Sequence, residues 1–412
     1  MDEMIKIEYV RQIFLETSKA FRFNLIEPSP IELLSVLEAK SGPSIRDEIY
    51  QFKDKGDREV ALRFDFTVGL TRYATSQKNL KLPAKFSSFG GVWRYDEPQK
   101  GRYRFFHQWN IETFGNLNTE HDAETIEFTS RFFDNLKLQN ISIDINHRKL
   151  VESYINQVFE SNETTLHDIF RAVDKTQKKS KDEILQEYKQ KGHSPEKLEK
   201  ILEFSNLKGT PSEIEQSFDT SSLDGWNELC NLYDSLKNRG IDNIRINFGI
   251  VRGLDYYSGI VFEAFDITSD LGALVGGGRY DNLPNAFGRN DLGATGVAGG
   301  VERIILRLDE QGISCTPSSN TISVLYVNDE LKSHAIYFAS VLRKLGVAVN
   351  IDLTGKPLKK QMEMSSNSKF SIIFAPEEIA KKRLVLRNMV DRTEKQISLD
   401  ELITNPKDVL NL

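Results

Sequence analysis

A long β-hairpin predicted between residues 89 and 115 constrains the fold of this chain more than any other feature. Extended runs at 92–95 and 105–114 flank a connection, EPQKGRYR, which is longer than a tight turn and carries three basic residues. Because side chains alternate along a strand, one face of the outgoing strand carries an aromatic ring, two amides and a carboxylate. These groups belong to Phe106, Gln108, Asn110 and Glu112. A charged face of this kind does not pack into a core, so it is either solvated or meets a ligand.

The segment IVRGLDYYSGIVFEAF at 250–265 combines strand-like flanks with a Ser-Gly turn. Its arginine, Arg252, can neutralise a phosphate without a metal, because a guanidinium is always charged and presents a fixed fork of donors. Tyr256 and Tyr257 can supply flat walls and hydroxyls for a small polar ring. Taken alone, the segment is explained equally well as an ordinary hairpin with an exposed arginine and core tyrosines.

Residues 58–67, REVALRFDFT, alternate between apolar and polar side chains, which predicts a strand. Asp65 and Thr67 share the polar face of that strand. A half-buried strand normally exposes its polar face to water, which is the simpler explanation. A carboxylate and a hydroxyl two residues apart are also what is needed to hold an ammonium group.

Helices are predicted at the start and in the middle of the chain. Apolar side chains recur at helical spacing over residues 10–21. Residues 166–236 have the mixed charge of an inserted helical module. Within it, Gly192 is a plausible helix stop and Ser194 a plausible N-cap for the helix that follows.

The last third of the chain changes twice in composition, from glycine-rich stretches to a linker and then to alternating strand-like and helical runs. Glycine-rich stretches at 272–283 and 293–306 contain neither a P-loop nor a GxGxxG pattern, and glycines in strands allow another backbone or a flat ligand to approach closely. Residues 309–321 have the composition of a linker. Residues 322–412 alternate strand-like and helical runs, which predicts a small α/β domain around a largely parallel sheet.

Composition limits the class of protein. The 412 residues suggest two or three domains, and the net charge of −6 argues against a chain devoted wholly to nucleic acid. We find no apolar run of about eighteen residues and no signal-peptide pattern, so we expect no membrane span and no secretion. The distant Cys230 and Cys315 and the scattered histidines predict a reducing cytoplasm and no protein-only metal site.

Five motifs, in order, resemble those of the histidyl-tRNA synthetases, a family of class II aminoacyl-tRNA synthetases. LRFDFTVGLTRYA at 62–74 resembles the segment that holds the amino acid, and WRYDEPQKGRYRFFHQ at 93–108 resembles class II motif 2. RGLDYYSGIVFE at 252–263 resembles the histidine-specific motif. GGGRYDNL at 276–283 resembles the glycine-rich strand region, and GVAGGVERI at 296–304 resembles motif 3. Each motif is weak to moderate evidence by itself, but five in the family order are specific.

The resemblance implies a fold, an activity and partners. The implied fold is an α+β catalytic domain, class II synthetase-like, with an antiparallel sheet flanked by helices. The implied domains are a catalytic domain at 1–165 and 237–308, a helical insertion at 166–236, a linker at 309–321 and an anticodon-binding-like α/β domain at 322–412. The implied activity is that of a histidine–tRNA ligase, which uses ATP with Mg²⁺ to form histidyl-adenylate from L-histidine and passes the histidyl group to tRNA(His). A cytoplasmic homodimer is also implied, with the first helix and the following strand contributing to the contact.

The resemblance also assigns roles to individual residues. The implied catalytic residues are Arg252 and Arg94, since positive charge at the transferring phosphorus stabilises the charge that develops in the transition state. The implied histidine contacts are Asp65, Thr67, Gln108, Glu112, Tyr256 and Tyr257. The implied ATP contacts are Arg94, Asp96, Arg104, Phe106 and Arg303. The implied tRNA contacts are Lys100, Arg102, Lys359 and Lys360.

One alternative stays open at this point: a non-catalytic regulatory paralogue of the same fold, such as the regulatory subunit of ATP-phosphoribosyltransferase. Such paralogues typically lack the C-terminal module and the arginine of the histidine motif, and this chain has both. The chain departs from the family pattern in several places, among them Phe64, Gly69-Leu70 and Trp109-Asn110, which stand where other residues are common. It lacks an Arg-Gly-x-Arg-Asp segment ahead of the first helix, and Asp96 stands where a glutamate is common.

Overall fold

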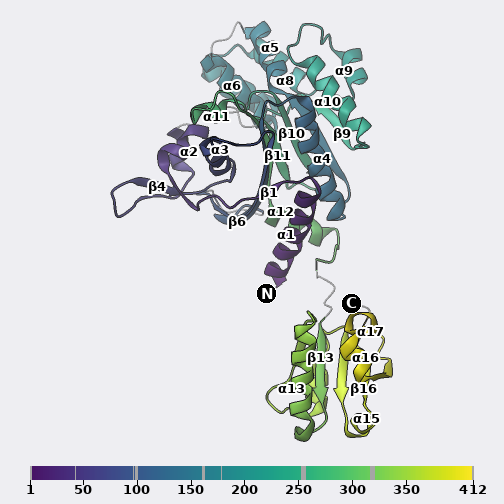
Figure 1. The fold of residues 1–412 in the computed structure, drawn as a ribbon. Helices are drawn as coiled ribbons and strands as arrows, with labels where there is room; N and C mark the ends of the chain where they lie inside the picture. Colours follow the sequence, from purple (N-terminus) through teal and green to yellow (C-terminus); the bar gives the residue numbers. More distant parts are fainter. Residues whose placement is uncertain are drawn as a thin grey trace. The chain divides into compact units, whose positions relative to one another are not determined.

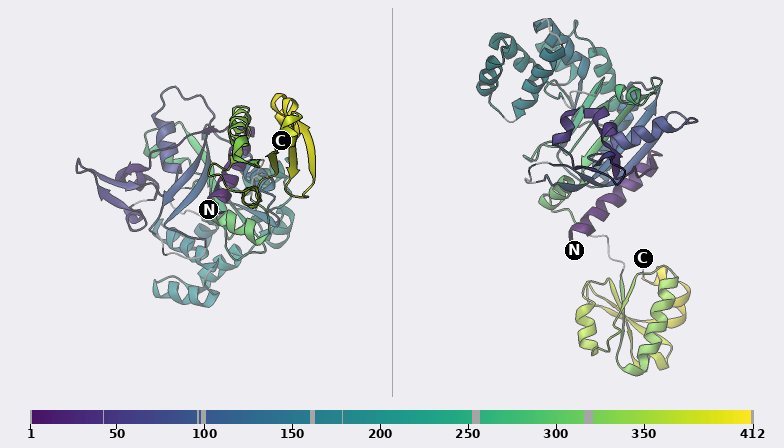
Figure 2. Two further views of the ribbon diagram at one scale, coloured as in Figure 1. Left: turned by 90° about the horizontal axis from the view of Figure 1, so that it is seen from below. Right: turned by 90° about the vertical axis from the view of Figure 1, so that its left-hand side faces the viewer.

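The chain folds into two compact units, Met1–Cys315 and Thr316–Leu412 (Figures 1 and 2). The computed structural model describes residues 2–41, 43–95, 97, 101–159, 163–177, 179–251, 257–315 and 321–410. Each unit is described by itself below.

The first unit is built around one large sheet. In sheet order, its strands within the described residues are β1 (Asn24–Leu25), β5 (Ala84–Trp93), β6 (Phe105–Gly115), β12 (Gly293–Gly300), β11 (Val275–Arg279), β10 (Ile260–Asp266), β7 (Ile141–His147), β9 (Ile244–Asn247) and β8 (Lys208–Gly209). The β1–β5 and β7–β9 pairs are parallel, and the other neighbours are antiparallel. The predicted hairpin is confirmed as β5 and β6, and the implied antiparallel sheet is confirmed with it.

One face of this sheet is packed against α1 (Asp2–Ala20), α4 (Thr119–Asn135) and α12 (Val301–Glu310). An aromatic cluster holds the helices there. The ring of Phe14 on α1 lies 5.6 Å from the indole of Trp109 on β6, and the ring of Phe132 on α4 lies 4.9 Å from the same indole. Trp109 is fully buried. Because this face of β6 belongs to the core, its alternate residues point to the opposite face of the sheet.

A second, three-stranded sheet projects from the first unit, in the order β2 (Ile31–Leu33), β4 (Glu59–Leu62), β3 (Gln51–Lys53) (Figure 1). Short helices lie next to it in the chain: α2 (Leu34–Ser41), a 3-10 turn at Pro43–Asp47 and α3 (Thr67–Ser76), with α11 (Asn282–Ala286) packed against α3.

The strand predicted over 58–67 is wrong beyond Leu62. β4 ends at that residue, and Thr67 is the first residue of α3. Phe66 is the N-cap of α3, and Asp65 lies just before it, with its Oδ1 accepting the N–H of Val68 in the first turn at 3.5 Å. Asp65 and Thr67 therefore lie at a helix start and do not share the face of a strand.

The middle of the chain is helical, as predicted. Its elements are α5 (Arg148–Phe159), α6 (Glu163–Asp174), a 3-10 turn at Lys175–Gln177, α7 (Lys181–Gln190), α8 (Pro195–Ser205), α9 (Pro211–Ser217) and α10 (Trp226–Asn238). The predicted restart is confirmed, since the Ser194 hydroxyl accepts the N–H of Lys197 at 3.5 Å and Pro195 opens α8. Tyr188 and Phe204 share one buried cluster with Ile145 of the main sheet. The helical insertion therefore belongs to the first compact unit.

The segment predicted as a linker begins inside the first unit. Asp309 lies in α12 and pairs with Lys6 of α1 at 2.7 Å. Cys315 is buried in the main core, and Ile313 packs against that core. Apolar packing of these two side chains outweighs the turn-like composition around them. Residues 316–320 lie outside the described residues.

The second unit is a small α/β domain. Its sheet has the order β14 (Val349–Ile351), β13 (Ile322–Tyr326), β15 (Phe370–Phe374), β16 (Arg383–Asn388), β17 (Glu394–Ser398), and its helices are α13 (Asp329–Lys344), α14 (Leu358–Met364), α15 (Pro376–Ala380), α16 (Leu399–Thr404) and α17 (Pro406–Leu410).

The prediction of a largely parallel sheet in this unit is only partly correct. β13 pairs in parallel with β14 and β15, but β15–β16 and β16–β17 are antiparallel. The connection at 375–382 is too short for a parallel crossover, which needs about a dozen residues. Across both units, no helix in the described ranges is long and apolar enough to cross a membrane.

Candidate active site

A cavity of about 560 Å³ opens on the polar face of β6. Its walls come from β6, β11 and β12, from the starts of α3 and α12, and from the end of the β5–β6 connection. The predicted residues that line it are Asp65, Thr67, Arg94, Arg102, Phe106, Gln108, Glu112, Tyr257 and Arg303. Gly276 and Tyr280 line it as well, so all five sequence motifs contribute to one cavity.

Glu112 is the centre of a buried hydrogen-bond network in this cavity. Its Oε1 accepts the hydroxyl of Thr67 at 2.7 Å and the amide of Asn110 at 3.1 Å, and its Oε2 accepts the hydroxyl of Tyr280. The Gln108 amide donates in turn to Asn110 at 2.7 Å. Glu112 is only 1% exposed, so its orientation is fixed. These donors are neutral side chains, and a buried carboxylate held in place by them suits recognition of an ammonium group.

The glycine at position 296 makes room for this carboxylate. Gly296 lies on β12 directly opposite Glu112 on β6. A Cβ atom built at Gly296 would lie 1.5 Å from Glu112 Oε2 and 2.6 Å from the backbone oxygen of Ile111. The close approach of a side chain is therefore the physical reason for a glycine in this strand.

Arg94 is oriented from three sides at the end of β5. Its Nε donates to the backbone oxygen of Phe64 at 3.0 Å, and its Nη2 donates to Gln108 Oε1 at 3.1 Å. Its guanidinium also lies 5.1 Å from the centre of the Phe106 ring. A guanidinium next to an aromatic ring in one cavity can bind a phosphate while the ring stacks on a flat base.

The first turn of α12 is tied to the hairpin. The Glu302 carboxylate accepts the backbone N–H of His107 at 2.8 Å and lies 3.0 Å from the Nδ1 atom of the same residue. Arg303 donates through Nη1 to the backbone oxygen of Ala273 at 2.7 Å and through Nε to that of Gly101 at 3.2 Å. These contacts set Arg303 at a fixed place opposite the Phe106 face of the hairpin.

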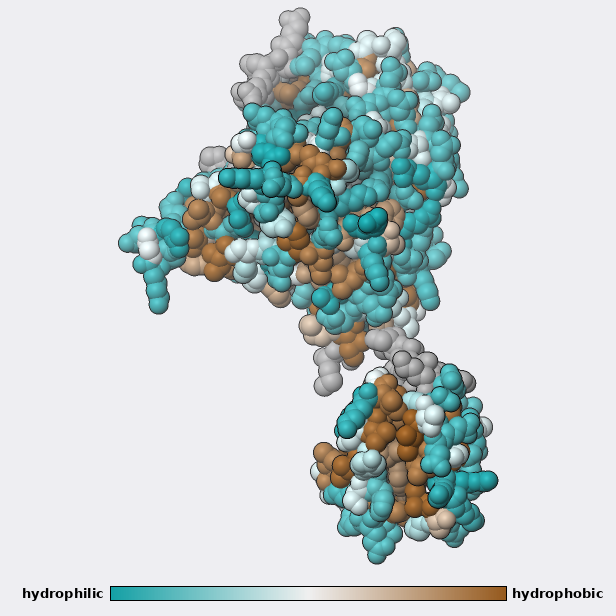
Figure 3. Space-filling model, viewed as in Figure 1, coloured by the Kyte–Doolittle hydropathy of each residue, from teal (hydrophilic) through white to brown (hydrophobic). Residues whose placement is uncertain are grey.

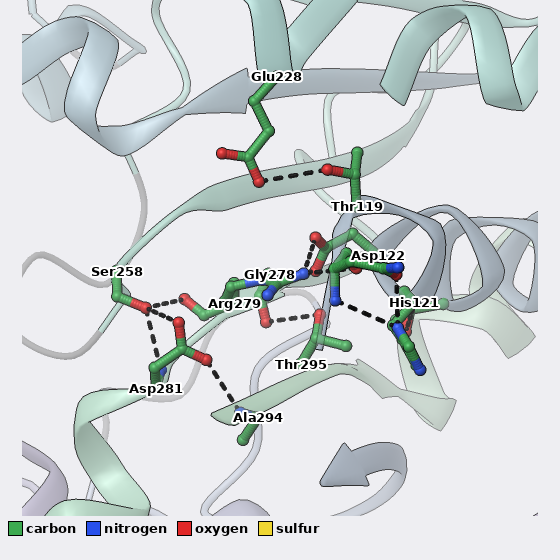
Figure 4. Close-up of polar contacts among 12 residues, drawn as sticks. Thr119, His121, Asp122, Glu228, Ser258, Gly278, Arg279, Asp281, Ala294 and Thr295 are labelled. Carbon is green, nitrogen blue, oxygen red and sulfur yellow. Dashed lines mark hydrogen bonds and ion pairs between the residues drawn. The ribbon is translucent and has the colours of Figure 1, made fainter. Parts of the chain in front are cut away.

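A buried ion pair lies beneath β11, on the helix side (Figure 4). Arg279 donates to both carboxylate oxygens of Asp122 on α4, with 3.3 Å from Nε to Oδ1 and a shorter contact from Nη2 to Oδ2. Its Nη2 also donates to the backbone oxygen of Asn118 at 2.7 Å. Burial raises the pKa of Asp122 to about 6, although contact with Arg279 acts in the opposite direction.

Arg104 is not among the residues that line the cavity. Arg104 is exposed and its guanidinium lies 4.7 Å from the Tyr95 ring. Lys359 and Lys360 are exposed on α14 in the second unit. Their contacts with ATP and tRNA stay predictions. The remaining predicted residues, Arg252, Tyr256, Asp96 and Lys100, lie outside the described residues.

Three residues that shape the cavity or its hydrogen-bond network are not predicted from the sequence. Asn110 lies on the polar face that strand alternation predicts. Its place on that face does not reveal that its amide donates to Glu112. Tyr280 lies in the glycine-rich motif, which indicates close backbone approach and gives no role to the tyrosine. Glu302 precedes the predicted Arg303, and nothing in the sequence signals that it binds the backbone of the hairpin.

An antiparallel sheet with a basic hairpin, a glycine-rich strand and a helix that opens on Glu-Arg, all around one cavity, defines the catalytic domain of a class II aminoacyl-tRNA synthetase. Residues 2–304 match the family described as histidyl-tRNA synthetase, and residues 321–407 match an anticodon binding domain. The chain belongs to the histidyl-tRNA synthetase family.

Individual relatives agree with this assignment. The histidine–tRNA ligase of Pyrococcus furiosus is 33% identical over 423 residues, which cover 99% of this chain and 96% of the relative. That of Thermoplasma volcanium is 29% identical and covers 97% and 95%. Since relatives over the whole chain are ligases, the regulatory paralogue is not favoured.

Solved structures share the fold. A histidyl-tRNA synthetase from Nostoc superposes with a TM-score of 0.83 at 24% identity, covering 98% of this chain and 95% of that one. A protein from Bacillus halodurans, described as an ATP phosphoribosyltransferase regulatory subunit/histidyl-tRNA synthetase, superposes with a TM-score of 0.74 at 21% identity, covering 91% and 96%.

Proposed function

We infer that the chain is a histidine–tRNA ligase, which activates L-histidine with ATP and transfers the histidyl group to tRNA(His). One observation carries the mechanism that we propose. The buried Glu112–Thr67 network and the Arg94–Phe106 pair line the same cavity. An ammonium-binding group thus stands next to a phosphate- and base-binding group, as the joining of an amino acid to a nucleotide requires.

The amino-acid end of the cavity is assigned to the carboxylates and tyrosines. The α-ammonium group of histidine binds Glu112 and Asp65, and the Thr67 hydroxyl holds Glu112 in place for this contact. Gln108 completes the polar wall. Tyr257, which lines the cavity, bounds the imidazole, and Tyr256 is proposed for the same role from the sequence alone.

The nucleotide end is assigned to the hairpin and to α12. ATP enters as its Mg²⁺ complex, with its adenine stacked on Phe106 and Arg303 on the side of α12. A carboxylate oxygen of histidine attacks the α-phosphorus, the bond to the bridging oxygen breaks, and pyrophosphate leaves. Arg94 stabilises the negative charge that grows on the phosphoryl oxygens. Arg252 is proposed as a second catalytic cation on the evidence of its motif.

Transfer to tRNA follows in the same cavity. A hydroxyl of the terminal ribose attacks the carbonyl carbon of the adenylate, and AMP leaves. Arg102 at the mouth of the cavity and the exposed Lys359 and Lys360 of the second unit are proposed to bind tRNA phosphates. We place the reaction in the cytoplasm, where the free cysteines Cys230 and Cys315 stay reduced.

The purified chain is expected to exchange pyrophosphate into ATP only when histidine is present. The physical reason is that the cavity combines the proposed ammonium site at Glu112 with the ring of Tyr257, which can bound an imidazole. The measurement is isotope exchange with Mg²⁺-ATP and each of the twenty amino acids in turn. Exchange with another amino acid at the same rate as with histidine would refute the proposal. The absence of exchange with any amino acid would refute it as well.

A homodimer is proposed through the β1 edge of the main sheet. Beside β1 lies a groove of about 440 Å³, and the buried hydroxyls of Ser18 and Ser87 that line it have no hydrogen-bond partner in the described part of the chain. Apolar side chains gather on the face over β1 and beside β4 (Figure 3). Leu25, Ile31, Leu33 and Phe52 there are each between 44% and 53% exposed. A second copy of the chain would cover these apolar side chains.

The dimer proposal predicts a mass twice the 47.1 kDa of the chain in sedimentation equilibrium. The double variant Leu25→Asp/Leu33→Lys places charges in the proposed contact and is expected to be monomeric at micromolar concentration. Val390→Lys is the matched control, because Val390 is 84% exposed in the second unit. A wild-type chain that sediments as a monomer would exclude the dimer.

A further inference from the structure

Two tyrosines line the cavity, and the residues that follow them in the sequence are hydrogen-bonded to each other. Tyr257 precedes Ser258, and Tyr280 precedes Asp281. The Ser258 hydroxyl donates to Asp281 Oδ2 at 3.2 Å and accepts the backbone N–H of Asp281 at 2.9 Å (Figure 4). Neither Ser258 nor Asp281 is among the residues that line the cavity. The Ser258–Asp281 hydrogen bonds therefore join the two segments that carry the tyrosine rings, without lining the cavity themselves.

Asp281 also reaches a third segment. Its Oδ1 accepts the backbone N–H of Ala294 at 3.1 Å, at the start of β12. This is the strand that carries Gly296, the residue opposite Glu112. Asp281, which follows the end of β11, thus binds the segment before β10 through Ser258 and the start of β12 through Ala294. All three segments supply residues to the cavity, namely Tyr257, Tyr280 and Gly296.

The backbone leaves the two rings little freedom. The N–H of Ser258 donates to the backbone oxygen of Arg279 at 2.8 Å. A Cβ atom built at Gly278 would lie 3.1 Å from Cδ1 of Tyr257, so the ring lies against the bare backbone of β11. Tyr257 and Tyr280 are 6% and 2% exposed, and the Tyr280 hydroxyl donates to Glu112. A small shift of either segment would therefore move a ring or displace a donor of Glu112.

We propose that Asp281, acting through Ser258, is a positioning residue that sets Tyr257 and Tyr280 for the amino-acid substrate. This inference rests on the assignment of the Glu112 end of the cavity to histidine. We assign Asp281 to the amino-acid end, because its carboxylate binds Ser258 and Ala294 and, among the described residues, makes no hydrogen bond to Arg94 or Phe106. Its loss should therefore weaken histidine binding selectively.

The test is the Michaelis constant for each substrate in the exchange reaction. Asp281→Ala is expected to raise KM for histidine about tenfold, since it removes two side-chain hydrogen bonds, while KM for ATP stays within about twofold of the wild-type value. Asp281→Asn keeps an acceptor for the Ala294 N–H and an amide that can donate to the Ser258 hydroxyl, so it should recover most of the loss. Ser258→Ala should show a smaller rise, and should add little to the Asp281→Ala variant.

Asp291→Ala is the matched control, because this carboxylate pairs only with the neighbouring Arg289 at the surface among the contacts described. It should leave both constants unchanged. Equal rises in the two constants, no rise in any of the variants, or additive effects of Asp281→Ala and Ser258→Ala would overturn the positioning role. If Asp281→Ala does not fold, the Ser258→Ala and Asp281→Asn variants decide. A wild-type chain without histidine-dependent exchange would instead contradict the proposed function.

Discussion

Replacing Arg94 with alanine is expected to slow histidine-dependent exchange by about 10²–10³-fold, the usual cost of removing a preorganised group that stabilises transition-state charge. The guanidinium is held by the Phe64 backbone oxygen, the Gln108 amide and the Phe106 ring. Preorganisation of this kind means that no rearrangement is needed when charge develops at the phosphorus. The loss should fall mainly on kcat, measured in steady-state exchange, because the contact strengthens as the reaction proceeds.

Two further variants make the result interpretable. Arg94→Lys keeps the charge but not the planar fork, so it should recover only part of the rate. Arg58→Ala removes an arginine that is 71% exposed and pairs with Asp54 in a turn, and its exchange rate should match that of the wild type. An Arg94→Ala rate within about threefold of the wild-type rate would show that the α-phosphate is stabilised elsewhere.

The sequence was most informative where a single strand decides geometry. Alternation along 105–114 predicted that Phe106, Gln108 and Glu112 share a face, and these residues do line one cavity. The prediction succeeds because the pleat of a strand is a local property, set by the backbone alone. The conclusion that five distant motifs meet at one cavity needed the family resemblance, because no local rule brings Thr67 next to Glu112.

The failures arise where an element ends earlier than the local pattern suggests, or where contacts join distant segments. Alternation over 58–67 suggests a strand, but β4 ends at Leu62 and α3 begins at Thr67, with the Asp65 carboxylate next to its first turn. The Tyr280–Glu112 and Glu302–His107 contacts join segments more than 150 residues apart, with separations of 168 and 195. Hydrogen bonds at this range depend on the registers of several strands, so no spacing in the sequence reveals them.

Replacing Asp122 with alanine is expected to lower the free energy of unfolding of the first unit by about 3–5 kcal/mol. The Arg279 guanidinium is 9% exposed and the Asp122 side chain 1% exposed, so the variant removes the carboxylate that pairs directly with a buried cation and leaves only the more distant charges of Asp281 and Glu228. The measurement is denaturant unfolding followed by tryptophan fluorescence at pH 8, where a carboxyl with a pKa of about 6 is ionised. Trp93, Trp109 and Trp226 all lie in the first unit, so the second unit contributes no signal.

A double variant separates the charge from the packing. Asp122→Leu/Arg279→Met removes both charges at similar volume and should lose less than about 1.5 kcal/mol, because apolar replacements of a buried ion pair are often neutral. Arg58→Ala, which breaks an exposed pair with Asp54 and leaves the backbone contacts of Asp54 in place, should lose less than about 1 kcal/mol. A double variant as unstable as Asp122→Ala would mean that packing around Asp122 matters more than charge. Since Arg279 and Tyr280 are adjacent, a stable double variant that still exchanges pyrophosphate would also show that the cavity side of β11 keeps its geometry without the ion pair beneath it.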